Sequence, residues 1–154
     1  MDLGDLIAPN DVFAAMRVNS KRQLLQDLAE RAADKTGMGS RQIFDTLLQR
    51  ERLGSTGVGN GIAIPHGKLP GLKAITGIFA RLEKPIDFEA LDDQPVDIVF
   101  LLLAPEGAGA DHLKALARIA RVMREPEQVD KLRETSDPAA IYTLLTESPA
   151  SHAA

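Results

Sequence analysis

A run of apolar residues near the middle of the chain limits the fold more than any other feature. The sequence reads "VDIVFLLLA" over residues 96–104, and only Asp97 interrupts the apolar character. This uniformity predicts a central strand that is covered on both faces, because a strand with one wet face alternates apolar and polar residues. The apolar part, residues 98–104, is also far shorter than the roughly 20 residues of a membrane-spanning helix.

Helical patterns surround this strand in the sequence. Leucines and alanines recur with helical spacing after Ser20, and Ser20 together with Gln23 has the pattern of a capping box. Gly37 is expected to end that helix. The other predicted elements are a helix from Ser40 to Gly54, a strand over 74–82, a helix over 109–123 with Leu113, Leu116, Ala117, Ala120 and Met123 facing inward, and short helices that begin at Pro126 and Pro138.

These elements predict a single α/β domain with a mixed central β-sheet flanked by helices on both sides. We expect the domain to span residues 1–147, since no repeat, low-complexity block or linker divides the chain. A chain of 154 residues is long enough to fold around one core without disulfides. Residues 148–154 are small and polar, and we expect them to form a flexible tail.

The composition excludes several classes of function. The chain has no cysteine, which rules out disulfides, thiol nucleophiles and thiolate metal sites. Its 18 basic and 22 acidic side chains give a formal net charge of -4, the wrong sign for a domain that binds nucleic-acid phosphates. The N-terminus carries acids where a signal peptide carries bases, so we expect a cytoplasmic protein without membrane insertion.

One glycine-rich segment invites a chemical interpretation. Residues 50–67 read "RERLGSTGVGNGIAIPHG". The segment lacks a Walker loop, because Lys68 is followed by leucine, and it lacks the dinucleotide fingerprint, because Ile62 stands where the third glycine belongs. We therefore interpret it as a flexible loop and a short apolar strand that present His66 on an exposed turn.

An exposed histidine in such a loop can accept a phosphoryl group. Most imidazoles with a pKa near 6.5 are uncharged at neutral pH and are nucleophilic without a base, and glycine N–H groups can approach phosphate oxygens closely. A tight turn with a hydrogen-bonded histidine fits the local composition equally well. A third interpretation is a metal hydrolase that uses His66, His112 and Asp111, although the sequence has no His-x-x-x-His pair. No cofactor is predicted.

Three segments together resemble the IIA domains of the bacterial phosphotransferase system, in the fructose/mannitol group. They are "STGVGNGIAIPHGK", "QPVDIVFLLLAP" and "HLKALARIARVM". The resemblance extends over nearly the whole chain. It implies that His66 accepts phosphate on its Nε2 nitrogen from a small histidine phosphocarrier protein, and that His112 and Arg50 belong to the same site.

Each implied residue also has a physical interpretation of its own. His112 is expected in the first helical turn with Asp111 as N-cap, where unpaired N–H groups favour an anion. A surface histidine fits the same local pattern. Arg50 has a planar donor fork suited to phosphate oxygens. It lies in the basic end of a helix, where it could simply offset the helix dipole while Arg41 or Arg52 supplies the local cation.

Ser55 and Thr56 are two further candidates, since their hydroxyl groups could donate hydrogen bonds to the phosphoryl group. Capping or turn stabilisation accounts for these hydroxyl groups more simply. His152 lies in the expected tail, and we assign it no role.

The segment "GVGNGIAIPHGKL" resembles the nitrogen-regulatory IIA proteins more than the sugar-specific ones. The resemblance implies a stand-alone phosphohistidine carrier whose phosphorylation state controls regulatory protein targets. Two alternatives remain open at this point: a stand-alone fructose/mannitol-type IIA component that passes phosphate to a sugar-specific IIB, and a binding module without phosphorylation. The sequence does not indicate the oligomeric state.

Overall fold

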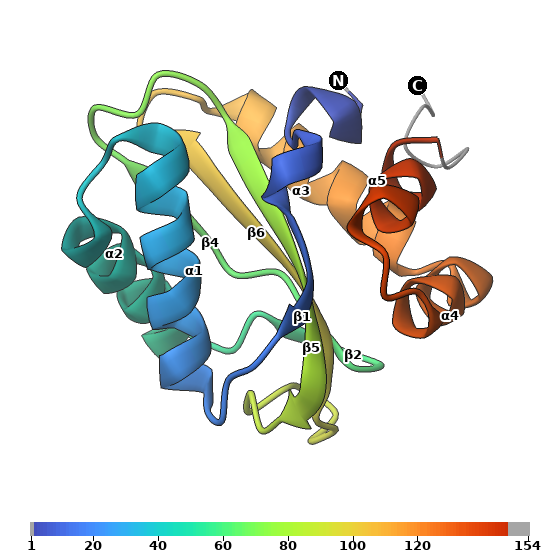
Figure 1. Ribbon diagram of the computed structural model, residues 1–154. Helices are drawn as coiled ribbons and strands as arrows, with labels where there is room; N and C mark the ends of the chain where they lie inside the picture. The colour runs from blue at the N-terminus through green and yellow to red at the C-terminus, as the bar shows by residue number, and fades with distance from the viewer. Residues whose placement is uncertain (1, 148–154) are drawn as a thin grey trace.

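The apolar run forms the strand β6 (Val96–Pro105), which lies in the middle of the sheet in the computed structural model (Figure 1). On one side β6 pairs antiparallel with β5 (Thr76–Ile86). On its other side β6 pairs parallel with two short strands in succession, β3 (Ile62–Ala63) and β4 (His66–Leu69). Because β6 has partners on both sides, the predicted central strand is confirmed. The structure describes residues 2–147.

Two more strands complete a six-stranded mixed sheet. The order is β1-β5-β6-β3-β2, with β4 paired to β6 off this path. At one edge β1 (Val12–Met16) runs parallel to β5, and at the other edge β2 (Gly57–Gly59) runs antiparallel to β3. The predicted mixed sheet is confirmed, and its strand order follows from these pairings.

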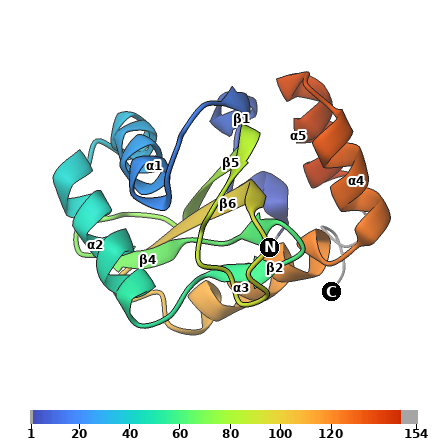
Figure 2. The ribbon, with the colours of Figure 1, turned by 90° about the horizontal axis from the view of Figure 1, so that it is seen from below.

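Helices cover both faces of this sheet, as Figure 2 shows from below. One face carries α1 (Lys21–Thr36) and α2 (Ser40–Arg52), and the other carries α3 (Ala110–Met123), α4 (Pro126–Glu134) and α5 (Pro138–Thr146). Two short 3₁₀ helices, Leu3–Asp5 and Pro9–Asp11, precede β1. The expected α/β class with helices on both sides is confirmed. Within the described part of the chain, no helix has the length and apolar character to cross a membrane.

The side chains of β6 divide the apolar interior into two cores. Val99, Leu101 and Leu103 pack on the side of α1 and α2, whereas Ile98, Phe100 and Leu102 pack on the side of α3, α4 and α5. All six are at most 1% exposed. This is the two-sided burial that the uniform apolar run requires, because successive strand side chains point to opposite faces.

Several helix ends lie where the sequence predicts them. The Ser20 side chain accepts a hydrogen bond from the Gln23 backbone N–H at 3.1 Å, which satisfies one of the free donors of the first turn. Gly37 ends α1 with a φ of 75°, a left-handed conformation that favours glycine. Pro126 and Pro138 each stand at the start of a helix, as predicted.

The predicted inward face of α3 is correct only in part. Met123 is buried and Leu116 and Ala120 pack against the core, but Leu113 and Ala117 are exposed. Leu113 is 66% exposed, whereas Ala115, Ile119 and Val122 are fully buried. The helix begins at Ala110, and its contact with the sheet lies about one position away from the stripe of leucines. The period of a helix is visible in its sequence, but when apolar residues extend beyond one stripe the pattern does not select which of them faces the core.

We expect substitutions on the two sides of α3 to differ in their effect on the free energy of unfolding. Ile119→Ala should lower the free energy of unfolding by roughly 2–5 kcal/mol, because it leaves a cavity in a closed core. Leu113→Ala should change it by no more than about 0.5 kcal/mol, since the side chain is exposed. Urea unfolding of both variants checks this, and the reverse ranking would restore the face predicted from the sequence.

Candidate functional site

His66 begins a strand and does not lie on an exposed turn. It is the first residue of β4, it pairs with Leu102 of β6, and its side chain is half-buried. The interpretation of the "PHG" segment as a turn is therefore wrong. The segment continues as a strand because β6 offers it a free edge, a partner that comes from a distant part of the sequence and is invisible in local turn composition.

The ring of His66 is held in one tautomer. Its Nδ1 lies 2.8 Å from the backbone carbonyl oxygen of Ile64. A carbonyl oxygen can only accept, so Nδ1 carries the proton and donates it. In the neutral ring the other nitrogen, Nε2, then carries no proton and has a lone pair that can accept a hydrogen bond or attack phosphorus. His66 therefore presents a nucleophilic nitrogen of defined orientation.

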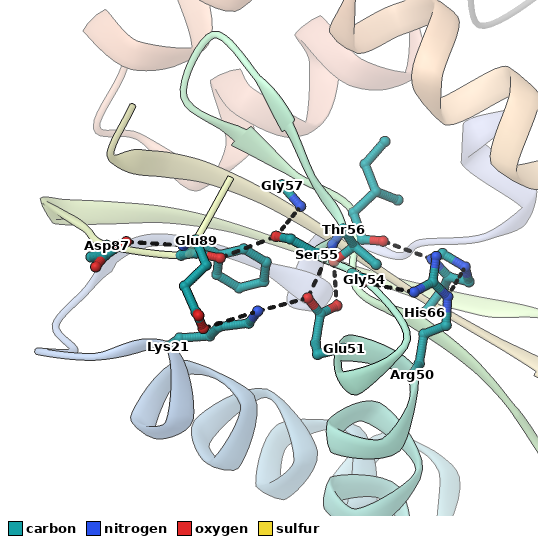
Figure 3. Close-up of polar contacts among 12 residues, drawn as sticks. Lys21, Arg50, Glu51, Gly54, Ser55, Thr56, Gly57, His66, Asp87 and Glu89 are labelled. Atoms are coloured by element: carbon teal, nitrogen blue, oxygen red, sulfur yellow. Dashed lines mark hydrogen bonds and ion pairs between the residues drawn. The ribbon is translucent and has the colours of Figure 1, made fainter. Parts of the chain in front are cut away.

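Arg50 is the residue that contacts this nitrogen. It lies in the last turn of α2, and its Nε is 3.3 Å from Nε2 of His66. Its Nη1 donates to the carbonyl oxygen of Gly54 at 2.9 Å. Figure 3 shows the two side chains pointing toward one another. Of the three arginines considered from the sequence, Arg50 is the one that the fold brings to His66.

His112 lies on the other side of the His66 ring. The two ring centroids are 5.7 Å apart and the ring planes are inclined by 50°. His112 is only 6% exposed, and its Nδ1 has no hydrogen-bond partner among residues 2–147. It does lie in the first turn of α3, but the N-cap is Gly109 with a φ of 55°, and the expectation that Asp111 caps the helix is wrong. The surface-histidine alternative is wrong as well.

The surroundings disfavour a positive charge on either ring. Burial lowers the pKa of His66, and the nearby Arg50 lowers that pKa further, against the hydrogen bond to Ile64 and the charge of Glu51, which raise it. Burial also lowers the pKa of His112, with His66 and Lys68 as additional causes. Both imidazoles are therefore mainly neutral at neutral pH.

The hydroxyl groups of Ser55 and Thr56 hold the loop between α2 and β2. Ser55 Oγ donates to the carbonyl oxygen of Phe88 and accepts from the N–H of Gly57, both at 3.1 Å. Thr56 Oγ1 donates to the carboxylate of Glu51 and is buried with it. These contacts are the turn stabilisation considered from the sequence. Binding of a phosphoryl group by either hydroxyl stays a prediction.

Three of the five glycines of the segment, Gly57, Gly59 and Gly61, do not surround His66. They belong to the hairpin of β2 and β3, in which Gly59 and Gly61 have φ values of 103° and 80°, whereas Gly67 follows His66 in β4 and Gly54 lies just after the end of α2. The hairpin tip is held by a hydrogen bond from Asn60 N–H to Asp92 at 2.9 Å. Ile62 pairs with Ile98 and His66 with Leu102, so the tip and the histidine lie about 13 Å apart along β6. The N–H groups of the hairpin glycines, which were expected to approach a phosphate, therefore lie away from His66.

Glu51 is a polar residue of the site region that the sequence interpretation missed. It follows Ile43, Phe44 and Leu47 on the inward face of α2 and is 8% exposed. A carboxylate in this position needs partners, because an unpaired buried charge is very unfavourable. The helical period of α2 therefore contained the signal: an acidic residue on an otherwise apolar face.

The structure offers no third ligand for the metal-hydrolase interpretation. Within residues 2–147, no group of three or more histidine, aspartate or glutamate side chains is arranged to hold a metal ion. His66 instead lies beside His112 and contacts Arg50.

The family follows from a match over almost the whole chain. Residues 5–148 match the model described as "Phosphoenolpyruvate-dependent sugar phosphotransferase system, EIIA 2". The chain belongs to this family. The resemblance based on the sequence segments is thus confirmed, and membership in the EIIA 2 family makes the chain a component of a phosphotransferase system.

Similar proteins add the branch within the EIIA 2 family. A "Nitrogen regulatory protein" of Bradyrhizobium diazoefficiens is 60% identical over 153 residues, which cover 99% of this chain and 100% of that protein. The crystal structure of the nitrogen regulatory protein IIA-Ntr from Neisseria meningitidis has a TM-score of 0.89 at 33% identity and covers 94% of this chain and 99% of its own. The expected likeness to nitrogen-regulatory IIA proteins is confirmed.

A more distant structure shares the fold alone. The mannitol IIA of Escherichia coli, in a complex with phosphorylated IIB, matches with a TM-score of 0.78 at 16% identity and covers 92% of this chain and 98% of its own. The α/β architecture around β6 is therefore common to both branches.

The lowered pKa values of His66 and His112 predict how stability depends on pH. Both start from an ordinary value of 6.5, so below that pH the unfolded chain binds more protons than the folded chain. The free energy of unfolding should fall as the pH drops from about 7 to about 5.5. The loss should be smaller in His112→Gln, because that variant lacks one of the two groups.

Urea unfolding at a series of pH values measures this difference. The comparison uses the slope against pH, so a general loss of stability in the variant does not affect it. Equal slopes for the wild-type chain and His112→Gln would contradict the lowered pKa of His112.

Proposed function

We propose that the chain is a phosphohistidine carrier and regulator of a nitrogen-type phosphotransferase system. In this proposal Nε2 of His66 accepts a phosphoryl group from a small histidine phosphocarrier protein, and the phosphorylation state controls the binding of regulatory protein targets. The observation that carries it is the fixed Nδ1–H tautomer of a neutral His66, whose free nitrogen lies beside Arg50 and His112. The proposal includes a cytoplasmic location, as the N-terminal sequence predicts.

The transfer itself needs only groups that the site and the donor supply. The lone pair of His66 Nε2 attacks phosphorus, the N–P bond of the donor phosphohistidine breaks, and its electron pair stays on the donor imidazole. Arg50 leaves Nε2 and turns its donor fork toward the phosphoryl oxygens. The hydrogen bond from Nδ1 to the Ile64 carbonyl oxygen supports the positive charge that develops on the ring during transfer.

His112 has two features that suit a phosphoryl group. It belongs to the first turn of α3, where backbone N–H groups and the helix dipole favour an anion. Its Nδ1 is buried without a partner among the described residues, which is unfavourable until an acceptor such as a phosphoryl oxygen enters the site. We therefore assign His112 to the stabilisation of the transferring group.

The names of the relatives support the regulatory part of the proposal. Proteins of Bradyrhizobium diazoefficiens and Neisseria meningitidis with high similarity are named for nitrogen regulation. One observation favours the alternative, a carrier that passes phosphate to a sugar-specific IIB: the mannitol IIA with the same fold is known in a complex with phosphorylated IIB. Its low identity gives it less weight.

His66→Ala should abolish incorporation of phosphate from a phosphorylated carrier, because it removes the accepting nitrogen. His112→Ala should still become phosphorylated, with an exchange rate lowered by a factor of roughly 10 to 100, since it removes stabilisation that acts in the transition state. Acid-labile, alkali-stable phosphate and its site of attachment are measured by mass spectrometry after incubation with the carrier chain.

His152→Ala is the matched control, since the sequence has three histidines and this variant keeps both of the others. Circular dichroism verifies that each variant is folded. Undiminished phosphate in His66→Ala would overturn the proposal, and a wild-type exchange rate in His112→Ala would remove His112 from the site.

Phosphorylation of His66 should change the affinity for a regulated target without a large change of fold. The added group carries about −1.5 to −2 charges, so it fills the surface above Nε2 and makes it more negative while Arg50 compensates the charge below. Affinity for a target captured by pull-down is measured with unmodified protein, phosphorylated protein and His66→Glu. Equal affinities in all three would favour the sugar-type carrier.

A further inference from the structure

A buried carboxylate lies directly behind the candidate site. Glu51 is next to Arg50 in the last turn of α2, but successive residues of a helix point about 100° apart, so Arg50 reaches the site while Glu51 points inward. The Glu51 side chain is only 3% exposed. Figure 3 shows it between Lys21 and the loop that contains Thr56.

The carboxylate of Glu51 binds two residues, Thr56 and Lys21, which come from different parts of the fold. Oε1 accepts from the backbone N–H of Thr56 at 3.0 Å and from Lys21 Nζ at 3.0 Å, and Oε2 accepts from the Thr56 hydroxyl group. Lys21 is the first residue of α1, and its ammonium group also lies 4.6 Å from the ring centre of Phe88. Glu51 therefore joins the start of α1, the end of α2 and the loop before β2.

Two chains of hydrogen bonds lead from this loop to the reacting nitrogen. In the first, the carbonyl oxygen of Thr56 accepts from Ile64 N–H at 3.0 Å, and the carbonyl oxygen of Ile64 accepts from His66 Nδ1 at 2.8 Å. In the second, the carbonyl oxygen of Gly54 accepts from Arg50 Nη1 at 2.9 Å, and Arg50 Nε lies 3.3 Å from His66 Nε2. The loop that Glu51 holds thus orients both residues.

We propose that Glu51 is a positioning residue for phosphoryl transfer: its bonds to Thr56 hold the Ile64 carbonyl that sets the His66 tautomer and the Gly54 carbonyl that aims Arg50. The inference rests on the proposed function of His66. Glu51 itself touches neither the ring of His66 nor the phosphoryl group. A positioning role of this kind acts on rate, because small displacements of reacting groups are costly.

The contacts favour this role over a purely structural one. A residue that only filled the core at this position could be apolar, since a buried ion pair adds little net stability over a hydrophobic pair of the same shape. A carboxylate instead supplies two oxygens that accept from the N–H and the hydroxyl group of one residue, which fixes the backbone direction of that residue. Its charge also opposes the lowering of the His66 pKa by Arg50.

The test uses two variants that weaken the hydrogen bonds between Glu51 and Thr56, which we call the anchor, in different ways. Thr56→Val removes the hydroxyl bond but keeps the Thr56 N–H bond and the Glu51–Lys21 ion pair, so the fold is retained. Glu51→Gln removes the charge. Glu89→Gln is the matched control, because Glu89 also faces Lys21, at 3.7 Å, but its side chain is 77% exposed and it makes no contact with Thr56.

The first measurement needs no phosphate. The ¹⁵N chemical shifts of the His66 ring in unmodified protein report which nitrogen carries the proton. We expect the Nδ1–H tautomer in the wild-type chain and in Glu89→Gln, and a mixture of tautomers in Thr56→Val and Glu51→Gln. The second measurement is phosphoryl transfer from the carrier, where we expect the maximal rate to fall about 10-fold or more at an unchanged half-saturating carrier concentration.

Thr56→Ser, which restores the hydroxyl group, should recover the wild-type tautomer and most of the rate. If Glu51→Gln does not fold, Thr56→Val still decides the question. A folded Thr56→Val with the wild-type tautomer and rate would overturn the positioning role while the proposed function stands. A wild-type chain that accepts no phosphate on His66 would instead overturn the proposed function, and the tautomer comparison would still show whether the anchor orients the ring.

Discussion

The parallel pairing of β4 with the C-terminal half of β6 is the contact on which the site depends. It places His66 opposite Leu102, near the end of a strand that leads through residues 106–109 into α3. His112 lies in the first turn of that helix, so the two imidazoles meet although they are far apart in the sequence. Because β6 is buried on both faces, both cores fix its position, and with it the position of His66, which is paired to it.

The same environment prepares the site for an anion. Burial and a neighbouring guanidinium group lower the pKa of His66, and burial and the charge of Lys68 lower the pKa of His112, so the site combines two neutral rings with the positive charges of Arg50 and Lys68. A phosphoryl group brings negative charge to this place, next to the N-terminus of α3. The positive charge of Arg50, which helps to keep the His66 ring neutral, therefore also favours an anionic group bound to that ring, whereas burial disfavours a charge of either sign.

The sequence predicts those parts of the structure that depend on local signals or on segments of high similarity. The central strand, the capping of α1 by Ser20 and the starts of α4 and α5 followed from patterns that a few neighbouring residues determine. The proximity of His66, His112 and Arg50 followed from the resemblance to IIA domains, since no local pattern contains a contact between such distant residues.

Apart from the N-cap of α3, which is Gly109 and not Asp111, the incorrect predictions concern contacts between distant segments. His66 was expected on a turn, but the free edge of β6 makes it part of a strand. The sequence pattern predicts Leu113 in the core, but α3 packs on the sheet through Ala115 and Ile119, and Leu113 is exposed. The helical period of α2 places Glu51 on the buried face, but its partners Thr56 and Lys21 come from a loop and from another helix, and no local pattern identifies them. Tertiary contacts decide each of these, and the sequence pattern alone leaves them open.

Gly61 lies where the hairpin of β2 and β3 meets β6. A Cβ atom at Gly61 would lie 2.2 Å from Nη2 of Arg133, whose Nε binds both carboxylate oxygens of Asp97 at 3.0 Å. A side chain at this position would therefore displace the arginine of α4 that ties the hairpin to β6. The backbone of Gly61 also accepts from the N–H groups of Asp97 and Ile98 at 3.0 Å, so the hairpin enters β6 at one defined register. These backbone bonds, together with the pairing of Ile62 with Ile98, set the register that places His66 opposite Leu102.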